Sequence, residues 1–472
     1  MRQFIRAFGV IRRRGRKGDL SHWFGLRVAV SALAGLSPAQ VAALQTYAIE
    51  DVTVIAMDRE RKLERHTVIV RDGRIADVGP SARVRAPRDA TRIDGRGKYL
   101  IPGLGDAHAH LSIGGGGPTL ADRALTLFAL NGVTMVRSAY TEPHHLASRD
   151  RVEQGTLIGP RTVIVSPPLA GPAAASPDAA RNAVRQFAAE KYQAIKVMPG
   201  MSATTFDTMV AEARAVGAKL VGHVPPSVGL ERVLDAGFAS VEHLDGFLEA
   251  LAPRGGEGPA ADGGFFGFAV PNVDDGRIPA LVAAVKRSGT TVVPTEHEME
   301  LFTSTDSGAA LRGRPEMQYA PRGLVEQWVR QKDGFASAVG VTPERSVWYR
   351  DVRRRLIREL HSAGVPIALG SDAFNMFAVP GWGTFDELET LASAGLTPFA
   401  ALTSATVRVA QLLGIPGVTG TIAVGGAADL VLLDADPLTD VANVRRQVGV
   451  MLRGRWMPRE EIQRRLAELA GS

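Results

Sequence analysis

The sequence predicts an α/β fold, a (β/α)8 TIM barrel joined to a small composite β-sandwich domain that both ends of the chain build. Five segments share one pattern, in which a helical run ends in Gly and a β-rich run follows, for example LFALNGVTMVRS, ARAVGAKLVGHV and IRELHSAGVPIALGSD. Gly just past a helix adopts the left-handed cap conformation without a Cβ penalty. Repeated helix–Gly–strand units indicate a parallel sheet, and eight such strands are the number of a TIM barrel.

The eight expected strands lie near residues 102–110, 133–139, 161–166, 194–198, 219–224, 240–244, 290–295 and 366–372. A doubly wound open sheet is the structural alternative, but the Gly run at 114–117 lacks the spacing of a nucleotide-binding turn. Residues 47–100 and 420–457 read as short alternating strands and form the expected sandwich. The predicted organisation is a leader at 1–43, sandwich strands at 44–100, the barrel at 101–415, and at 416–472 the rest of the sandwich with a C-terminal helix.

Two long insertions interrupt the expected barrel. Residues 250–278 are rich in Gly and aromatic residues, and residues 296–350 have a helical pattern that carries Trp328 and Trp348. Both leave from βα loops, which form the active-site face of a barrel. We therefore expect lids or substrate walls from them.

The basic charge belongs to the leader. Residues 1–46 hold eight Lys or Arg and one acid, which leaves 47 basic and 48 acidic residues elsewhere, so the body has no basic footprint for nucleic acid. No apolar run approaches the roughly 20 residues of a membrane-spanning helix, so no stable membrane insertion is expected. The run RRRGRK, the apolar WFGLRVAVSALAGL and the small residues before Leu44 predict a signal peptide and a periplasmic or secreted protein. The alternatives are a cytoplasmic protein with a disordered basic arm, and a start codon chosen wrongly.

Six titratable residues stand in or at the ends of the expected strands. Two of them, His108 and His110 in LIPGLGDAHAHLS, are spaced so that both rings point to one face of a strand. Barrel strands end at one mouth, and burying these groups together without a metal would leave several uncompensated. The absence of Cys excludes thiolate ligands. We expect a metal centre made of His108, His110, Lys196, His223, His243 and Asp372.

These motifs resemble the amidohydrolase superfamily, and within it the imidazolonepropionase-like and prolidase-like enzymes. GLGDAHAHLS is similar to the HxH of that family's first strand, and AIKVM, GHV, VEHLDG and GSDAF stand where its metal ligands fall. The segment from LTPFAAL to DADPLTD is similar to its closing helix and returning sandwich strands. The resemblance covers residues 47–457. Two features depart from it: Arg137-Ser138 replaces a common Arg-Asp, and residues 250–350 are long and divergent.

The resemblance implies a binuclear centre of two divalent ions, expected to be zinc. His108, His110 and Asp372 would hold the first ion, and His223 and His243 the second. Lys196 would carry a carbamate formed with CO₂ and bridge both ions, since a free ammonium has no lone pair for a metal. The ions would make hydroxide available near neutral pH. Asp372 would act as general base and then as general acid.

The expected activity is metal-dependent hydrolysis of a C–N amide bond in small N-acyl amino acids or dipeptides, of a carboxypeptidase or prolidase type. One alternative is a mononuclear ring-amide hydrolase resembling imidazolonepropionase, against which Lys196 argues, because a single ion needs no bridging lysine. Another is a non-catalytic binding or assembly protein on a retained barrel. The expected partner is a small-molecule substrate, and homo-oligomerisation stays open. Further candidates for substrate contact are His144, His145 and His297.

Overall fold

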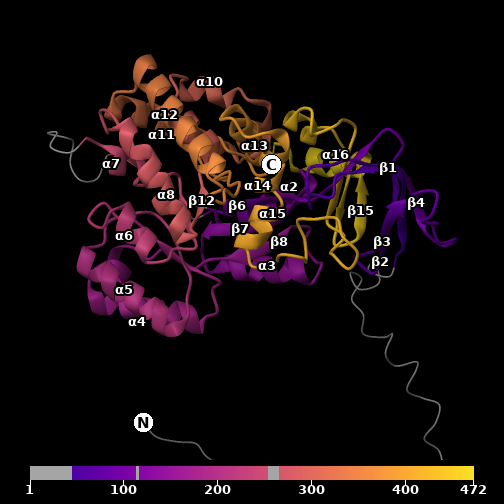
Figure 1. Ribbon diagram of the computed structural model, residues 1–472, viewed down its shortest axis with the longest axis horizontal. Coiled ribbons are helices and arrows are strands. Elements are labelled where there is room, and N and C mark those ends of the chain that lie inside the picture. The colour runs from indigo at the N-terminus through magenta and orange to yellow at the C-terminus, as the bar shows by residue number, and fades with distance from the viewer. Residues whose placement is uncertain (1–44, 113–115, 254–264, 472) are drawn as a thin grey trace, which may run out of the picture.

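The structure is a computed structural model that describes residues 45–112, 116–253 and 265–471. The expected leader at 1–43 lies outside these residues. The described chain has a mixed α/β fold in which one sheet lies at one end of the molecule and helices surround parallel strands at the other (Figure 1). Within the described ranges, no helix is both long enough and apolar enough to cross a membrane.

Both ends of the chain join in one eight-stranded sheet, ordered β15-β14-β13-β5-β1-β2-β3 with β4 beside β1. Strand β13 pairs antiparallel with β5, so that Leu430 lies opposite Pro102. The indigo and yellow strands therefore lie side by side in Figure 1. This pairing across the chain agrees with the expected composite domain. The strands are β1 (Tyr47–Val54), β2 (Leu63–Arg71), β3 (Arg74–Pro80), β4 (Thr91–Asp94), β5 (Tyr99–Pro102), β13 (Leu430–Leu433), β14 (Gln447–Leu452) and β15 (Arg455–Pro458).

The parallel strands form two sheets, ordered β6-β7-β8 and β12-β11-β10-β9. Every pair within them is parallel, as the repeated helix–Gly–strand units predict. The five predicted cap glycines all have positive φ: Gly132 72°, Gly217 70°, Gly237 78°, Gly289 71° and Gly364 80°. The strands are β6 (Leu104–His110), β7 (Val133–Tyr140), β8 (Arg161–Ile164), β9 (Ile195–Val197), β10 (Leu220–Gly222), β11 (Ser240–Glu242) and β12 (Thr291–Val293).

The eighth expected strand, at 366–372, is not regular. It has one isolated parallel bridge, between Ile367 and Val292 of β12. Beyond the bridge it turns to β6, where the amide of Ala107 donates to Leu369 O at 2.7 Å and the amide of Asp372 donates to His108 O at 2.7 Å. The left-handed backbone of Asp372, with φ 59°, ends any extended run there. The segment contacts both β12 and β6 and brings Asp372 beside the first strand.

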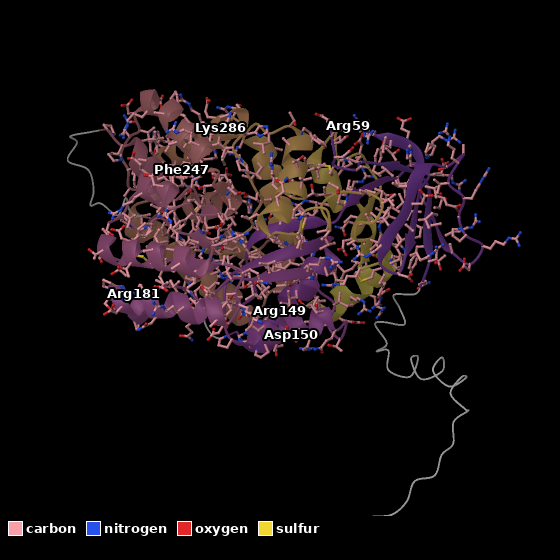
Figure 2. All side chains as sticks on the ribbon, turned by 60° about the horizontal axis from the view of Figure 1, so that its bottom comes forward. Arg59, Arg149, Asp150, Arg181, Phe247 and Lys286 are labelled. Carbon is pink, nitrogen blue, oxygen red and sulfur yellow. The ribbon has the colours of Figure 1, made fainter. Side chains whose placement is uncertain are left out.

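Helices follow the strands and cover them. They are α2 (Gly117–Leu130), α3 (His144–Glu153), α4 (Pro177–Ala189), α5 (Ala203–Val216), α6 (Leu230–Asp235), α7 (Phe247–Leu251), α8 (Ile278–Ser288), α13 (Trp382–Ser393), α14 (Pro398–Ser404), α15 (Val407–Leu412) and α16 (Arg459–Leu469). Arg149 and Asp150 of α3 lie on the outside and hydrogen-bond each other (Figure 2).

The region 296–350 is helical, as expected, and packs over the end of the eighth segment. It contains α9 (Glu296–Thr303), α10 (Gly308–Arg312), α11 (Arg322–Val339) and the start of α12 (Pro343–Ser362). Trp328 of α11 is buried, with ring centroids 5.8 Å from Phe374 and 5.7 Å from Phe377. This insertion therefore supports the loop that follows Asp372.

Candidate metal centre

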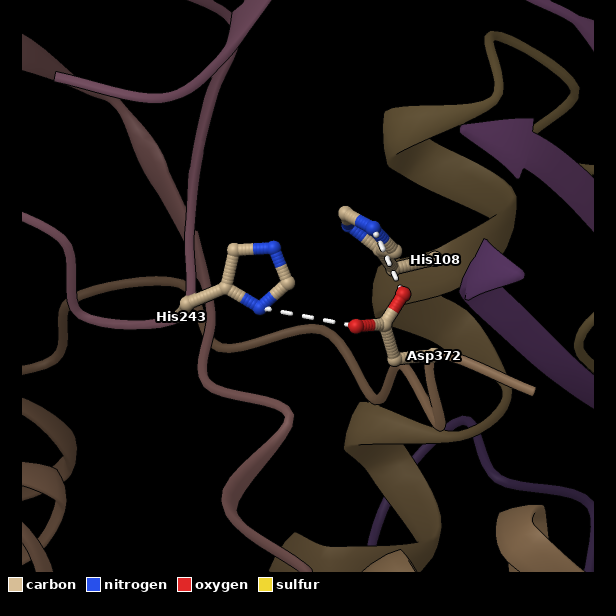
Figure 3. Close-up of side chains that lie close together, drawn as sticks. All are labelled: His108, His243 and Asp372. Atoms are coloured by element: carbon tan, nitrogen blue, oxygen red, sulfur yellow. Dashed lines mark ion pairs between the residues drawn. The ribbon is translucent and has the colours of Figure 1, made fainter. Parts of the chain in front are cut away.

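Three of the predicted residues come together with ligand atoms within 4.8 Å of one another: His108, His243 and Asp372 (Figure 3). His108 and His110 both lie at the end of β6, and each Nε2 approaches Asp372 Oδ1, at 3.1 Å and 2.5 Å. Asp372 Oδ1 nevertheless has no hydrogen-bond partner of acceptable geometry in the described structure. The two rings therefore converge on one oxygen of the carboxylate.

The other two predicted residues line the same place. The His223 ring, just past β10, stacks on His243 with centroids 5.0 Å apart at 24°. Lys196 in β9 is buried, and its Nζ has no hydrogen-bond partner among the described residues. Gly222 is required beside it, because a Cβ there would lie 2.4 Å from Val197 O and 3.1 Å from Lys196 Cδ. All six predicted residues thus lie in one buried neighbourhood.

Burial sets the protonation states of this neighbourhood. It lowers the pKa of Lys196 to about 8, although Glu242 and Asp372 oppose the shift. It also lowers the pKa values of His110, His223 and His243. Burial alone would raise the pKa of Asp372, but His110 and His108 outweigh it and hold that pKa well below its usual range. Neutral imidazoles, a carboxylate and a readily deprotonated amine are the forms that bind metals.

A buried chain of polar contacts orients His108. Its Nδ1 donates to Glu242 Oε2 at 2.7 Å, and Arg137 donates from Nη2 to Glu242 Oε1 at 2.8 Å. All three side chains are almost fully buried. Because Nδ1 carries the hydrogen, Nε2 keeps its lone pair free towards Asp372. On the other side, Asp106 accepts hydrogen bonds from the amides of His108 and Ser371, both at 3.1 Å.

His243 is oriented from the neighbouring strand. Its Nδ1 lies 2.7 Å from Thr295 Oγ1, and 4.0 Å from Asp372 Oδ2. His243, Thr295 and Asp372 all have left-handed backbones, with φ of 61°, 47° and 59°. Such conformations are costly for residues other than Gly and cluster at functional sites. The backbone at three strand ends is thus bent to face the side chains inward.

These residues fit a metal. At this place the described structure gives no hydrogen-bond partner to His110 Nδ1 and Lys196 Nζ, while His223 Nδ1 has only the long contact to Asp245 Oδ2 at 3.4 Å, and Asp372 Oδ1 faces the His108 and His110 rings. Unpartnered buried polar atoms are expensive, and so many in one cluster indicate a ligand. Imidazole and carboxylate together suit zinc and other first-row divalent ions.

His144 and His145 form a separate cluster at the start of α3. Ser112 Oγ lies 2.8 Å from Glu142 Oε2, 2.8 Å from His145 Nε2 and 3.2 Å from His144 Nε2. The amide of Glu142 donates to His145 Nδ1, so the hydrogen of this neutral imidazole sits on Nε2. Nε2 is then a donor to Ser112 and not a metal ligand. The cluster is near enough to the centre for His110 to help lower the pKa of His145.

His297 takes no part in this neighbourhood. Its Nε2 lies 3.3 Å from Asp386 of α13, and Arg314 is its other neighbour. The structure thus separates the three further candidates: two lie near the predicted metal ligands and one in a peripheral ion network.

Several residues of the site were not singled out from the sequence. Glu242 lies one residue before His243, and a buried acid within the apolar run SVEH was the available signal. Phe266, from the expected insertion at 250–278, covers the His243 ring at 4.8 Å and the His223 ring at 5.8 Å. Glu298 lies against Asp372. No local pattern indicated Phe266 or Glu298.

Comparison with known proteins places these residues in a family. The model of the Amidohydrolase family matches residues 99–457. An imidazolonepropionase of Chromobacterium violaceum is 26% identical, over 83% of this chain and 89% of its own length. An adenine deaminase of Ruegeria pomeroyi is 33% identical, but only over 25% of this chain and 18% of its own length. A solved structure from Bifidobacterium longum, provisionally named a prolidase, superposes with a TM-score of 0.63 and 25% identity, covering 90% of this chain and 99% of the other.

Proposed function

The chain belongs to the amidohydrolase family, and on that premise we propose that it hydrolyses the C–N amide bond of dipeptides or N-acyl amino acids at a binuclear zinc centre. The family is metal-dependent and acts on carbon–nitrogen bonds. The observation that carries the proposal is the convergence of four imidazoles, a lysine amine and Asp372, several of whose buried polar atoms have no hydrogen-bond partner.

We assign His108, His110 and Asp372 to one ion, His223 and His243 to the other, and a carbamate on Lys196 to both. The carbamate forms when the neutral amine of Lys196 attacks CO₂ and releases a proton. The lowered pKa of Lys196, about 8, supports this step, because it leaves a neutral fraction near neutral pH. When bound, the ions supply a water of lowered pKa and polarise the substrate carbonyl.

The residues of the chain then handle the proton. Asp372 is anionic and lies beside the His108 and His110 rings, so it can accept the proton of the attacking water. It can return that proton to the leaving nitrogen as the amide breaks. Phe266 covers the His223 and His243 rings and reduces access of water from its side.

The choice of substrate rests on the relatives. The solved structure provisionally named a prolidase favours dipeptides, while the imidazolonepropionase of C. violaceum favours a ring amide and a single ion. The buried Lys196 supports the two-ion alternative, because its unpartnered amine has no evident use beside a single ion. A non-catalytic binding protein would have no use for an oriented His108 and an anionic Asp372.

The test is a screen of zinc-loaded protein against dipeptides, N-acyl amino acids and the ring amide imidazolonepropionate, with Asp372→Asn as the inactive control. Hydrolysis of a dipeptide or N-acyl amino acid, lost in the control, supports the proposal. Hydrolysis of the ring amide alone would favour the mononuclear alternative. No hydrolysis of any class would contradict the proposed substrates.

We also propose that the parallel strands close as a (β/α)8 barrel and that the terminal sheet folds as a sandwich. Support comes from segment 366–372, which hydrogen-bonds to β12 and β6 at once, and from the bridge of Leu169 to Val197 of β9.

Export to the periplasm or outside the cell is a proposal as well, carried by the basic leader. Mass spectrometry of the native protein would find a mature N-terminus near residue 44, whereas intact Met1 in the cytosol would refute export.

A further inference from the structure

Glu298 is a buried acid near the metal centre to which the proposed function assigns no role. It lies in the first turn of α9, and its side chain is fully buried. Neither carboxyl oxygen accepts a hydrogen bond from an amide, guanidinium or hydroxyl group among the described residues. The charged group that it touches is Asp372. Two buried carboxyl groups in contact can be joined by a proton or by a cation, and burial together with Asp372 raises the pKa of Glu298 well above its usual range.

The neighbouring buried acids, Glu296 and Glu387, both have hydrogen-bond donors as partners. Glu296, two residues earlier, accepts from Arg353 Nε at 2.9 Å. Glu387 of α13 accepts from the amides of Glu296 and His297, at 3.0 and 2.7 Å. Glu298, by contrast, has neither an arginine nor an amide as a partner among the described residues, and its side chain contacts Asp372. Its lack of a partner is therefore a feature of the side that faces Asp372.

The start of α9 is held firmly in that orientation. Glu387 accepts from the first amides of α9 and so caps the helix. Thr295, the residue before α9, contacts His243 Nδ1 at 2.7 Å. Arg353 donates both to Glu296 and to His243 O, the latter at 2.8 Å. Arg353 is completely buried. The helix that carries Glu298 is thus tied to the backbone and side chain of His243, and Glu298 is preorganised beside the centre.

We propose that Glu298 is a further metal-binding carboxylate, which shares a divalent cation with Asp372. The inference rests on the metal centre of the proposed function. It also improves the charge balance there. Two divalent ions carry four positive charges, and the histidines are neutral, so that Asp372 and a carbamate on Lys196 compensate only half of the charge. A cation bound to Glu298 would displace its proton, and Glu298 would then add a third anion in a place where uncompensated charge is expensive.

The test compares Glu298→Gln with Glu300→Gln as matched control. Gln keeps the shape of the side chain and removes the negative charge. Glu300 lies two residues further along α9 and pairs instead with Arg354, at 2.6 Å. The metal content of each protein is measured during competition with a chelator, and thermal unfolding is measured with and without metal.

We expect Glu298→Gln to lose its metal at a chelator concentration at least about tenfold lower than wild type does, as for other groups that tune a metal site. Its metal-free form should unfold at the same temperature as wild type or higher, because two touching carboxyl groups are replaced by one. The gain in unfolding temperature on adding metal should be smaller. Glu300→Gln should retain metal like wild type.

Unchanged metal retention in Glu298→Gln would overturn the inference, and a less stable metal-free form would then show a purely structural role. Glu298→Asp serves if the Gln variant does not fold, with weaker retention expected from the shorter reach and unchanged retention again refuting. Wild-type protein that binds no divalent ion would overturn the metal centre of the proposed function and this inference together. Normal metal binding without hydrolysis of the screened amides would refute only the proposed substrates.

Discussion

The chain from Arg137 through Glu242 to His108 allows one substitution to be followed in detail. Glu242 Oε2 accepts from His108 Nδ1, while Oε1 accepts from Arg137 and from Ser240 Oγ at 2.6 Å. Glu242→Gln has one oxygen where two are needed. If that oxygen stays with Arg137, the amide NH₂ faces His108 Nδ1 and makes it an acceptor. The hydrogen of His108 then moves to Nε2, which can no longer bind a metal.

Two magnitudes follow. Loss of the correct tautomer should weaken metal binding by about 10- to 100-fold, the range for residues that orient a ligand. Arg137 would also remain buried without its counter-charge, which costs about 3–5 kcal/mol when one partner of a buried pair is removed. The assays are chelator competition for the metal and urea unfolding of the metal-free protein.

The double variant Glu242→Gln, Arg137→Met isolates the cause. Without the guanidinium, the amide can turn its NH₂ towards Ser240 and its oxygen towards His108, which restores the tautomer. Metal retention and stability should both recover in part, since an apolar replacement of a buried pair is close to neutral. Metal retention that stays normal in Glu242→Gln alone, or that stays low in the double variant despite regained stability, would refute the reasoning.

Two further predictions concern proton transfer and pH. Asp372→Asn should fold but lose about 100-fold or more in turnover of a substrate found in the screen; near-normal turnover would place the proton shuttle elsewhere. Burial, with His144 and His110, lowers the pKa of His145 to about 3, so between pH 3 and 6.5 the unfolded chain binds the proton that the folded chain excludes. The free energy of unfolding therefore decreases as the pH falls below 6.5. His145→Gln, which mimics the neutral ring, should not show this loss of about 1.4 kcal/mol per pH unit. Parallel stability curves of both proteins from pH 7 to 5 would contradict this.

Local sequence pattern predicted the strand ends well. The alternation in HxH and the Gly before each strand depend on neighbouring residues, and the five cap glycines have the expected positive φ. The same reasoning brought His108, His110, Lys196, His223, His243 and Asp372 to one place. These features could be predicted because each is set by a few consecutive residues and by the direction of parallel strands.

Contacts between distant segments could not be predicted in this way. Glu242 meets His108 across 134 residues, and Glu298 meets Asp372 through the loop after β12. The sequence pattern indicated His297 as a candidate for substrate contact just as it did His145. In the structure, however, His297 lies on the side of α9 that faces Asp386. The eighth strand was expected to be regular, yet it leaves β12 after one bridge to meet β6. Each of these depends on how the segments pack.

Metal content tests whether Lys196 bridges two ions in an amide-hydrolysing centre. Wild-type protein and Lys196→Ala are loaded with zinc in bicarbonate buffer, freed of excess metal and analysed for bound zinc and for turnover. We expect about two ions per wild-type chain and one or fewer in the variant, with lower turnover that a small carboxylic acid partly restores together with the metal. Wild-type protein that saturates with a single ion, and a Lys196→Ala variant that keeps both that ion and its activity, would contradict a binuclear centre bridged by Lys196.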